Sequence, residues 1–228
     1  MREKVSVIIP AYNEGQRIGA TVKAASTIAK VTEVLVVDDG SRDATGVVAR
    51  RAGAKVLTLP RNQGKGKALT KGISSISNNI ILLLDADLGD TAVQADLLLA
   101  PLLAGEADMT IGVFPPVAAK TGLGIALGLA RLGTKLLTGL TLQAPLSGQR
   151  GFTREALWEV QPFLPGFGVE VGLNVRAARR GLRIKEIPVG MKHRNTGLNF
   201  SGLWHRGRQF CHILLALLHL FWEDLGGV

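Results

Sequence analysis

Cysteine, aromatic residues and long apolar runs are all scarce in this chain. It has a single cysteine, Cys211, in 228 residues, which excludes an intramolecular disulfide and a cysteine-based zinc site. Aromatic residues make up 5% of the sequence, which argues against the base-stacking surface of a nucleic-acid-binding module. No uninterrupted apolar run reaches the ~18–20 residues that span a bilayer. The apolar stretch behind residues 1–4 stops at Pro10, so no secretory leader is expected. These absences favour a cytoplasmic protein, with peripheral contact at the inner face of the membrane left open.

The composition is that of a folded domain with a basic surface. Hydrophobic residues make up 46% of the chain and charged residues 20%, which allows a packed core and excludes global disorder. Lysine and arginine number 27 against 18 acidic residues, for a net charge of +9. Such an excess favours an anionic partner, such as a nucleotide, a sugar phosphate, a nucleic acid or an acidic lipid.

Short aliphatic runs alternate with helical spacing through the first half. The runs at 5–9, 34–37, 56–59, 80–84 and 109–113 are typical of strands buried on both faces. Helices are predicted over 16–29, 44–52, 65–76 and 92–103, the last with a capping box at Thr91 and Gln94. This order predicts an open, doubly wound, mostly parallel α/β sheet with helices on both faces.

The second half is more apolar and contains fewer strand signals. Residues 117–142 are rich in glycine, leucine and alanine, 169–180 predict a helix and 184–189 a strand. An apolar helix is predicted over 203–222. We therefore expect one α/β domain over residues 1–200, followed by a C-terminal apolar helix within 201–228. That helix could pack on the core, form a homodimer interface or lie on a membrane surface.

Polar and acidic residues follow three of the predicted strands. They are Pro10, Ala11, Tyr12, Asn13 and Glu14 after the first strand, Asp38 and Asp39 after the second, and Asp85, Ala86 and Asp87 after the fourth. Ligands of open α/β sheets bind outside the carboxyl ends of the strands, so these residues predict a binding site at one edge. Carboxylates gathered there repel one another unless a ligand or a cation binds them.

Two of these segments have a chemistry that suits a nucleotide. Asp85 and Asp87 are two residues apart, so on an extended strand end both carboxylates can address one hard cation. The segment N-Q-G-K-G-K (62–67) combines glycines with lysines, which suits an oxyanion, and includes Gly64 and Lys65. It is not a Walker A loop, because Ala68 stands where Ser or Thr is required.

The motifs together resemble a known family. V-I-I-P-A-Y-N-E (7–14), V-V-D-D-G-S-R-D-A-T (36–45), N-Q-G-K-G-K-A-L (62–69) and L-D-A-D-L (84–88) occur in the order typical of family 2 nucleotide-sugar glycosyltransferases with the GT-A fold. Weaker matches continue through S-G-Q-R-G-F (147–152), G-F-G-V-E (166–170) and H-R-N-T-G (193–197). The resemblance implies a metal-dependent hexosyltransferase that uses a UDP- or GDP-sugar, with UDP-glucose as our first expectation.

The resemblance also assigns residue roles. It implies that the segment with Pro10, Ala11, Tyr12, Asn13 and Glu14 surrounds the nucleoside, and that Asp38 and Asp39 help to hold the base. Gly64 and Lys65 would contact the nucleotide, and Asp85, Ala86 and Asp87 would form the Asp-x-Asp motif, with Mg²⁺ or Mn²⁺ on Asp87.

Four residues of the second half complete the predicted site. The resemblance favours His193 as a further ligand of the metal or the diphosphate, although the residues alone favour a surface histidine. Arg150 and Arg194 are candidates for anion clamps, because guanidinium groups bind phosphate in a bidentate manner. Glu170 is a candidate for the general base or for a residue that orients the sugar.

The acceptor stays open between two subgroups. Polyprenyl-phosphate sugar synthases and glucosyl-3-phosphoglycerate synthases both resemble this chain, so we expect a phosphate-bearing acceptor. Gly112-Val113-Phe114 departs from the Gly-Ser-Arg of the first subgroup, whereas Pro145-Leu146-Ser147-Gly148 matches the second. Two rival functions remain: a sugar-nucleotidyltransferase, and a basic nucleic-acid- or membrane-binding module without activity.

Overall fold

The molecule is built around a seven-stranded sheet, in the order β3-β2-β1-β4-β6-β5-β7. The computed structural model describes residues 3–115, 123–192, 200–224 and 226. The strands are β1 (Val5–Ala11), β2 (Val31–Asp38), β3 (Lys55–Thr58), β4 (Ile80–Leu83), β5 (Met109–Val113), β6 (Arg150–Thr153) and β7 (Ile184–Pro188). Strand β6 is antiparallel to β4 and to β5, and the other pairings are parallel. The predicted α/β class with a mostly parallel sheet is therefore confirmed.

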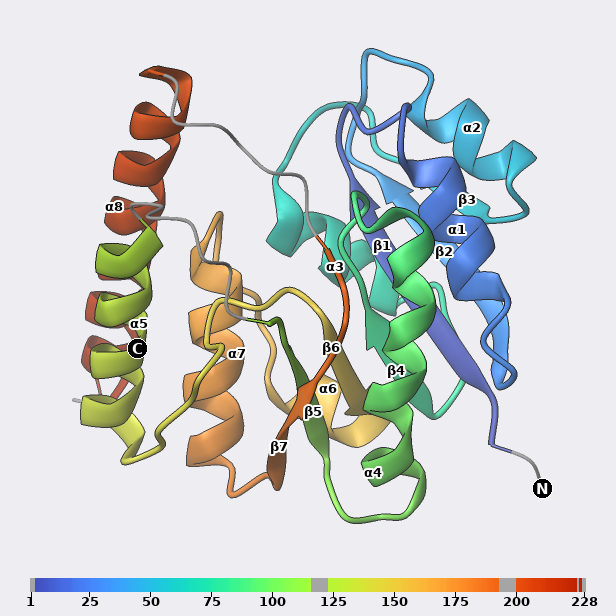
Figure 1. The fold of residues 1–228 in the computed structure, drawn as a ribbon. Coiled ribbons are helices and arrows are strands. Elements are labelled where there is room, and N and C mark those ends of the chain that lie inside the picture. The colour runs from blue at the N-terminus through green and yellow to red at the C-terminus, as the bar shows by residue number, and fades with distance from the viewer. Residues whose placement is uncertain (1–2, 116–122, 193–199, 225, 227–228) are drawn as a thin grey trace.

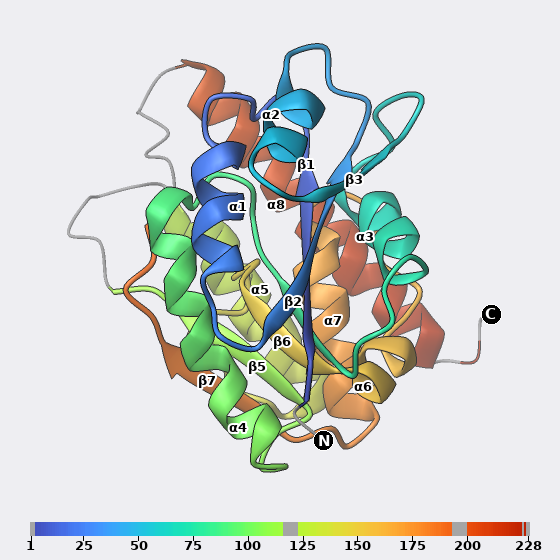
Figure 2. The ribbon, with the colours of Figure 1, turned by 90° about the vertical axis from the view of Figure 1, so that its right-hand side faces the viewer.

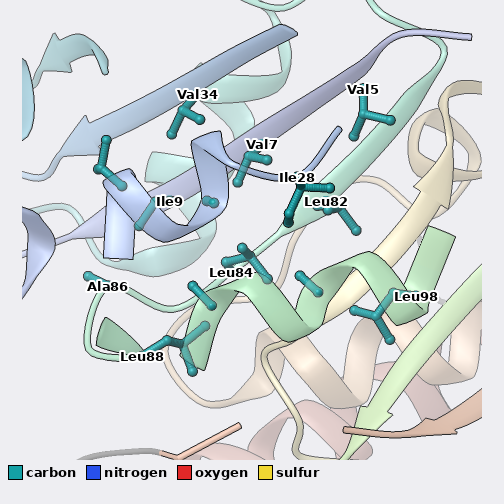
Figure 3. Close-up of a cluster of buried hydrophobic side chains, with 14 of the residues drawn as sticks. Val5, Val7, Ile9, Ile28, Val34, Leu82, Leu84, Ala86, Leu88 and Leu98 are labelled. Carbon is teal, nitrogen blue, oxygen red and sulfur yellow. The ribbon is translucent and has the colours of Figure 1, made fainter. Parts of the chain in front are cut away.

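Helices cover both faces of the sheet. One face carries α1 (Ile18–Ser26), α2 (Thr45–Arg51), the 3₁₀ helix η1 (Gly89–Leu98) and α4 (Leu99–Leu103), and the other carries α3 (Lys65–Ile73), α6 (Arg154–Glu159) and α7 (Gly168–Arg179). Figure 2 shows α1 and α4 to the left of β1 and β2, and α3 and α6 to their right. Aliphatic side chains from alternate strand positions fill each face, as Val5, Val7 and Ile9 do on the α1 side (Figure 3).

A third layer lies outside α7. Helices α5 (Leu123–Thr138) and α8 (Phe200–Asp224) lie side by side and pack on α7 (Figure 1). Val171 and Val175 of α7 share a buried cluster with Ile213, Leu217 and Leu220 of α8. Helix α7 is therefore covered on both sides, and all of its residues from Gly168 to Ala177 are buried.

The predicted helix over 92–103 and its capping box are wrong in detail. The chain forms η1 and then α4 there. The Thr91 hydroxyl donates to the carbonyl of Leu88 at 2.7 Å and accepts the backbone N–H of Lys192 at 3.1 Å, so it does not cap a helix. A short side chain that bonds locally competes with helix formation in this way.

The parallel strands end together at one edge of the sheet. Residues Ala11 and Asp38 are register partners at the ends of β1 and β2, and Val113 and Pro188 are partners at the ends of β5 and β7. Asp85 and Asp87 follow β4 between these two pairs of strands. The predicted site residues at 10–14, 38–39 and 85–87 therefore lie at the same edge of the sheet.

Candidate active site

The loops after β1 and β2 are tied together by hydrogen bonds. The backbone N–H of Asn13 donates to Ser41 Oγ at 3.0 Å, and the N–H of Arg42 donates to Asn13 Oδ1 at 2.9 Å. Asn13 has a φ of 55°, in the left-handed region that asparagine tolerates better than most residues. Tyr12 stays 42% exposed beside them, between the buried Ala11 and the bonded Asn13. The two loops thus form one surface that carries an open aromatic ring.

The two aspartates at the end of β2 are almost fully buried and accept backbone hydrogen bonds from the neighbouring loops. Asp38 Oδ1 accepts the backbone N–H of Ser41 at 3.0 Å. The two carboxylate oxygens of Asp39 accept the N–H groups of Gln63 and Gly64, at 2.8 and 2.7 Å. Asp39 therefore attaches the glycine- and lysine-containing segment to the sheet edge. A direct contact of either aspartate with a base remains a prediction.

Lys65 lies between two carboxylates that come from distant parts of the chain. It is the first residue of α3, and its Nζ lies 2.7 Å from Asp85 Oδ1 and 2.8 Å from Glu170 Oε1. Burial on its own disfavours the charged ammonium, but the two carboxylates outweigh burial and raise the pKa of Lys65. Lys65 is therefore a permanent cation at the carboxyl edge, and it joins α3, the end of β4 and the first turn of α7.

The Asp-x-Asp segment is held in place on both sides. The backbone N–H of Asp85 donates to Gln149 Oε1 at 2.9 Å, and Gln149 Nε2 donates to Asp85 Oδ2 at 2.6 Å. Ala86 is buried, and its carbonyl accepts the hydroxyl of Thr21 at 2.8 Å. Asp87 is half-buried. These bonds fix the turn that contains both aspartates.

The residues of this turn fit a hard divalent cation. Carboxylates such as those of Asp85 and Asp87 are the ligands that Mg²⁺ and Mn²⁺ prefer. Within residues 3–115, 123–192, 200–224 and 226, no group of three or more acidic, histidine or cysteine side chains is close enough together to hold a metal ion. The third predicted ligand, His193, lies outside the described residues, as does Arg194.

The Arg150 guanidinium is buried and bonded to protein acceptors, which corrects the expectation that it clamps an anion. Its side chain is 1% exposed, and its guanidinium donates to the carbonyls of Ser147, Pro145 and Glu170 and to Asn174 Oδ1. Burial lowers the pKa of Arg150 to about 10, which leaves it charged at neutral pH. Because protein acceptors surround the guanidinium, Arg150 holds the segment before β6 against the start of α7.

Glu170 lies in the first turn of α7, as predicted for a residue of the site. It is 7% exposed, and its carboxylate accepts a hydrogen bond from Lys65. Pro10, Lys65, Arg150 and Glu170 all line a small cavity of about 10 Å³ beneath the edge. The structure thus brings together predicted residues from β1, α3, β6 and α7.

An open hollow lies at the ends of β5 and β7. Its volume is about 410 Å³, and apolar side chains dominate its described lining: Val113, Phe114, Pro115, Pro188, Val189 and Gly190. The N–H of Gly112 donates to the carbonyl of Gln149 at 2.9 Å, and the side chain of Gln149 bonds Asp85. Val113, which directly follows Gly112, lines the hollow, so the hollow lies close to the Asp85 turn.

Gln149, Gly148 and Asn174 were not predicted as site residues. A Cβ at position 148 would lie 2.7 Å from Asp85 Oδ1, so only glycine lets the backbone approach that carboxylate. Asn174 holds the Arg150 guanidinium at 2.7 Å. Gln149 and Gly148 lie within the motif S-G-Q-R-G-F, where the charge of Arg150 drew the prediction to the neighbouring residue.

Comparisons with known proteins identify the family. The model of "Glycosyl transferase family 2" matches residues 6–160. Glucosyl-3-phosphoglycerate synthase of Mycobacterium tuberculosis is 33% identical over 231 residues, which cover 89% of this chain and 70% of the relative. Its counterpart in Mycolicibacterium smegmatis is 34% identical, with coverages of 93% and 77%. Glycosyltransferase AglJ of Haloferax volcanii is 32% identical, with coverages of 82% and 62%.

Solved structures agree with this result. The M. tuberculosis synthase in complex with Mn²⁺, UDP-glucose and phosphoglyceric acid has a TM-score of 0.80 and 29% identity, over 96% of this chain and 79% of that chain. The same enzyme with Mg²⁺ and UDP has a TM-score of 0.81 and 28% identity, over 96% and 79%. The metals in these relatives are the two expected from the sequence. Glycosyl transfer is thereby favoured over nucleotidyl transfer, and this chain belongs to the family 2 glycosyltransferases of the GT-A fold.

Proposed function

We propose that this chain transfers glucose from UDP-glucose to a phosphate-bearing acceptor, with 3-phosphoglycerate as the first candidate. The observation that carries the proposal is the Lys65 ammonium, held 2.7 Å from Asp85 and 2.8 Å from Glu170 at the carboxyl edge. Cationic groups bind a diphosphate, and carboxylates can accept hydrogen bonds from the hydroxyls of a sugar. The cluster of Lys65, Asp85 and Glu170 contains both kinds of group in one site. Relatives at 33–34% identity are named for the same transfer.

The donor would lie across the loops of the carboxyl edge. Tyr12 and the hydrogen-bonded loops after β1 and β2 form the surface for the nucleoside. Lys65 faces the diphosphate. Asp87 and Asp85, with His193, would hold Mg²⁺ or Mn²⁺, which supplies positive charge for a departing diphosphate. Arg194 is the remaining proposed clamp for the phosphates.

The reaction exchanges one C–O bond for another at the anomeric carbon. The bond between that carbon and the diphosphate breaks, and the diphosphate leaves with the electron pair. An oxygen of the acceptor forms the new bond; the proton of a hydroxyl acceptor passes to the departing diphosphate, and an ionised phosphate acceptor has no proton to lose. We assign Glu170 to orient the sugar, because its carboxylate is fixed by Lys65 at the edge. In Glu170→Gln the amide oxygen can still accept the hydrogen bond of Lys65, so kcat should fall by a larger factor than UDP affinity changes.

A donor and acceptor screen tests this function. UDP-glucose, Mn²⁺ and 3-phosphoglycerate should give UDP release and a glucosylated acceptor, and GDP-glucose should give far less product. If UDP is released only at the slow rate of donor hydrolysis, and 3-phosphoglycerate does not accelerate the release, UDP-glucose would be supported as the donor and 3-phosphoglycerate would be overturned as the acceptor. No effect of UDP and Mn²⁺ on the melting temperature would contradict both.

A lipid-linked phosphate is the second candidate acceptor, and an apolar outer surface favours it. Exposed apolar side chains line α5 and α8: Ile125, Leu132, Leu136, Leu214, Leu215, Leu218, Phe221 and Trp222. The exposed basic residues Arg131, Lys135 and Arg208 lie on the same two helices. Among the described residues, no helix is long and apolar enough to cross a bilayer. This outer surface would instead rest on the membrane interface, and polyprenyl phosphate in the same screen tests the alternative.

A further inference from the structure

Gln149 holds Asp85 by two hydrogen bonds that run in opposite directions. Its Oε1 accepts the backbone N–H of Asp85 at 2.9 Å, and its Nε2 donates to Asp85 Oδ2 at 2.6 Å. The amide thus bonds the main chain and the carboxylate of the same residue. This pairing restricts both the backbone and the rotamer of Asp85.

The backbone of Gln149 is itself fixed by hydrogen bonds. The residue is 0% exposed, its backbone N–H reaches Ser147 Oγ at 3.3 Å, and its carbonyl accepts the N–H of Gly112 at 2.9 Å. The next residue, Arg150, anchors the same strand end through its bonds to α7. Successive side chains of a strand point to opposite sides, so Gln149 reaches Asp85 while Arg150 reaches α7.

A neutral amide suits this position better than a charged group. Asp85 Oδ1 bonds Lys65 at 2.7 Å, and the Lys65 ammonium must keep its charge for an anionic ligand. A lysine or arginine in place of Gln149 would neutralise Asp85, and a glutamate would repel it. Glutamine orients the carboxylate and leaves its negative charge available to Lys65 and to a cation.

We propose that Gln149 is a positioning residue for the nucleotide-sugar donor, because its amide fixes the Asp85 carboxylate that in turn fixes Lys65. The inference rests on the proposed function, since it assumes that Asp85 and Lys65 belong to the donor site. The proposed role runs through Asp85, so the effect of removing the glutamine amide on donor binding should depend on whether Asp85 is present.

A double-mutant cycle tests the inference. UDP affinity in the presence of Mn²⁺ is measured by calorimetry for the wild type, Gln149→Met, Asp85→Ala and the double variant. Gln149→Met removes both hydrogen bonds to Asp85 and should weaken UDP binding about 10-fold, of the order expected when a charge-assisted hydrogen bond is lost. In the Asp85→Ala background, Gln149→Met should change the affinity by less than about 2-fold, because the residue it positions is absent.

Matched variants separate positioning from general stability. Arg154→Met removes a partly buried hydrogen bond just beyond the opposite end of β6, where the Arg154 guanidinium donates to the carbonyl of Asn78 at 3.0 Å. This variant should leave UDP affinity unchanged. Gln149→Asn, which is one methylene shorter and cannot make both bonds, repeats the test if Gln149→Met unfolds. Equal losses for the glutamine variant in both backgrounds would overturn the inference. A wild type that does not bind UDP with Mn²⁺ would instead overturn the proposed function, and the inference with it.

Discussion

At the scale of single residues, the site is organised by one cation shared between two carboxylates. Lys65 is contributed by α3, Asp85 by the end of β4 and Glu170 by α7, so residues up to 105 positions apart meet at one ammonium. Desolvation of any of these charges alone would be costly, and their contact offsets that cost. The same arrangement leaves a cation at the edge where a diphosphate would bind.

Lys65→Met should weaken UDP binding about 10-fold or more, because a charge-assisted contact to phosphate is lost and two carboxylates then repel the nucleotide. Lys67→Met provides the control, since Lys67 is exposed on the same helix. Calorimetry with UDP should separate the two variants. Equal affinities for Lys65→Met and Lys67→Met would exclude Lys65 from the nucleotide site.

Gly148→Ala should reduce both stability and activity. The new Cβ would lie 2.7 Å from Asp85 Oδ1, so the carboxylate or the backbone must shift. Such overpacking costs typically about 1–3 kcal/mol. Gly128→Ala in α5 is the matched control, because no atom lies within 4 Å of its added Cβ. Denaturant titration compares the two, and a neutral Gly148→Ala would show that the Asp85 turn is less closely packed than described.

At the scale of elements, an ion pair between Asp108 and Arg183 joins the starts of β5 and the edge strand β7. Asp108 accepts the backbone N–H of Arg183 at 2.8 Å and its Nε and Nη2 at 3.0 and 2.7 Å, just before β5 and β7 begin. The hydrogen bond with the Arg183 side chain lowers the pKa of Asp108. The pair therefore aligns the edge strand β7, whose far end leads into the apolar hollow.

Asp108→Asn should lower the melting temperature at neutral pH and have little effect in acid. Because the folded-state pKa is lowered, the carboxylate stabilises the fold above its ordinary pKa of ~3.9, and this contribution is lost as the pH falls through the folded value. Melting curves from pH 7 to pH 3 should converge for the two proteins. Asp96→Asn, on the exposed side of η1, is the control. A constant difference across the range would rule out the ionised pair as the cause.

Elements with strong periodicity could be predicted from the sequence, and those set by tertiary contacts could not. The aliphatic runs form β1, β2, β4 and β5, as expected, and the start of α3 and both ends of α7 agree with expectation to within one residue, whereas α3 ends three residues earlier than predicted. Strand β6 was missed, because R-G-F-T is too short and mixed to give a signal and forms only between β4 and β5. Because β6 was not predicted, neither the contact of Gln149 with Asp85 nor the burial of Arg150 could be predicted, since both depend on that strand. The strand-end acids, in contrast, were visible as a pattern.

At the scale of the whole molecule, the apolar outer surface of α5 and α8 is the feature without a partner in the described structure. The exposed fractions of Leu136 and Trp222 are 76% and 61%. Helix α8 also carries core residues such as Ile213 and Leu220, so its removal would damage the α7 cluster as well as the surface. Substitutions on the exposed side are therefore the informative test.

The full chain should bind anionic liposomes in a salt-sensitive manner, since each basic residue near such a surface contributes ~1 kcal/mol. The double variant Leu218→Glu/Trp222→Glu should lose most of this binding, whereas Val47→Glu/Val93→Glu, at exposed sites on α2 and η1, should keep it. Flotation of wild type and variants measures the effect. No association at low salt would exclude the lipid surface, and a shift from dimer to monomer in Leu218→Glu/Trp222→Glu would assign the face to a second copy.

The central claim is that the carboxyl edge binds a nucleotide-sugar with a divalent cation through Asp87. Calorimetry of UDP binding, with and without Mn²⁺, on the wild type and on Asp87→Ala tests it most directly. The account predicts that Mn²⁺ strengthens UDP binding to the wild type, and that Asp87→Ala abolishes this enhancement without a change in melting temperature. An Asp87→Ala variant with the same Mn²⁺-linked UDP affinity as the wild type would contradict it.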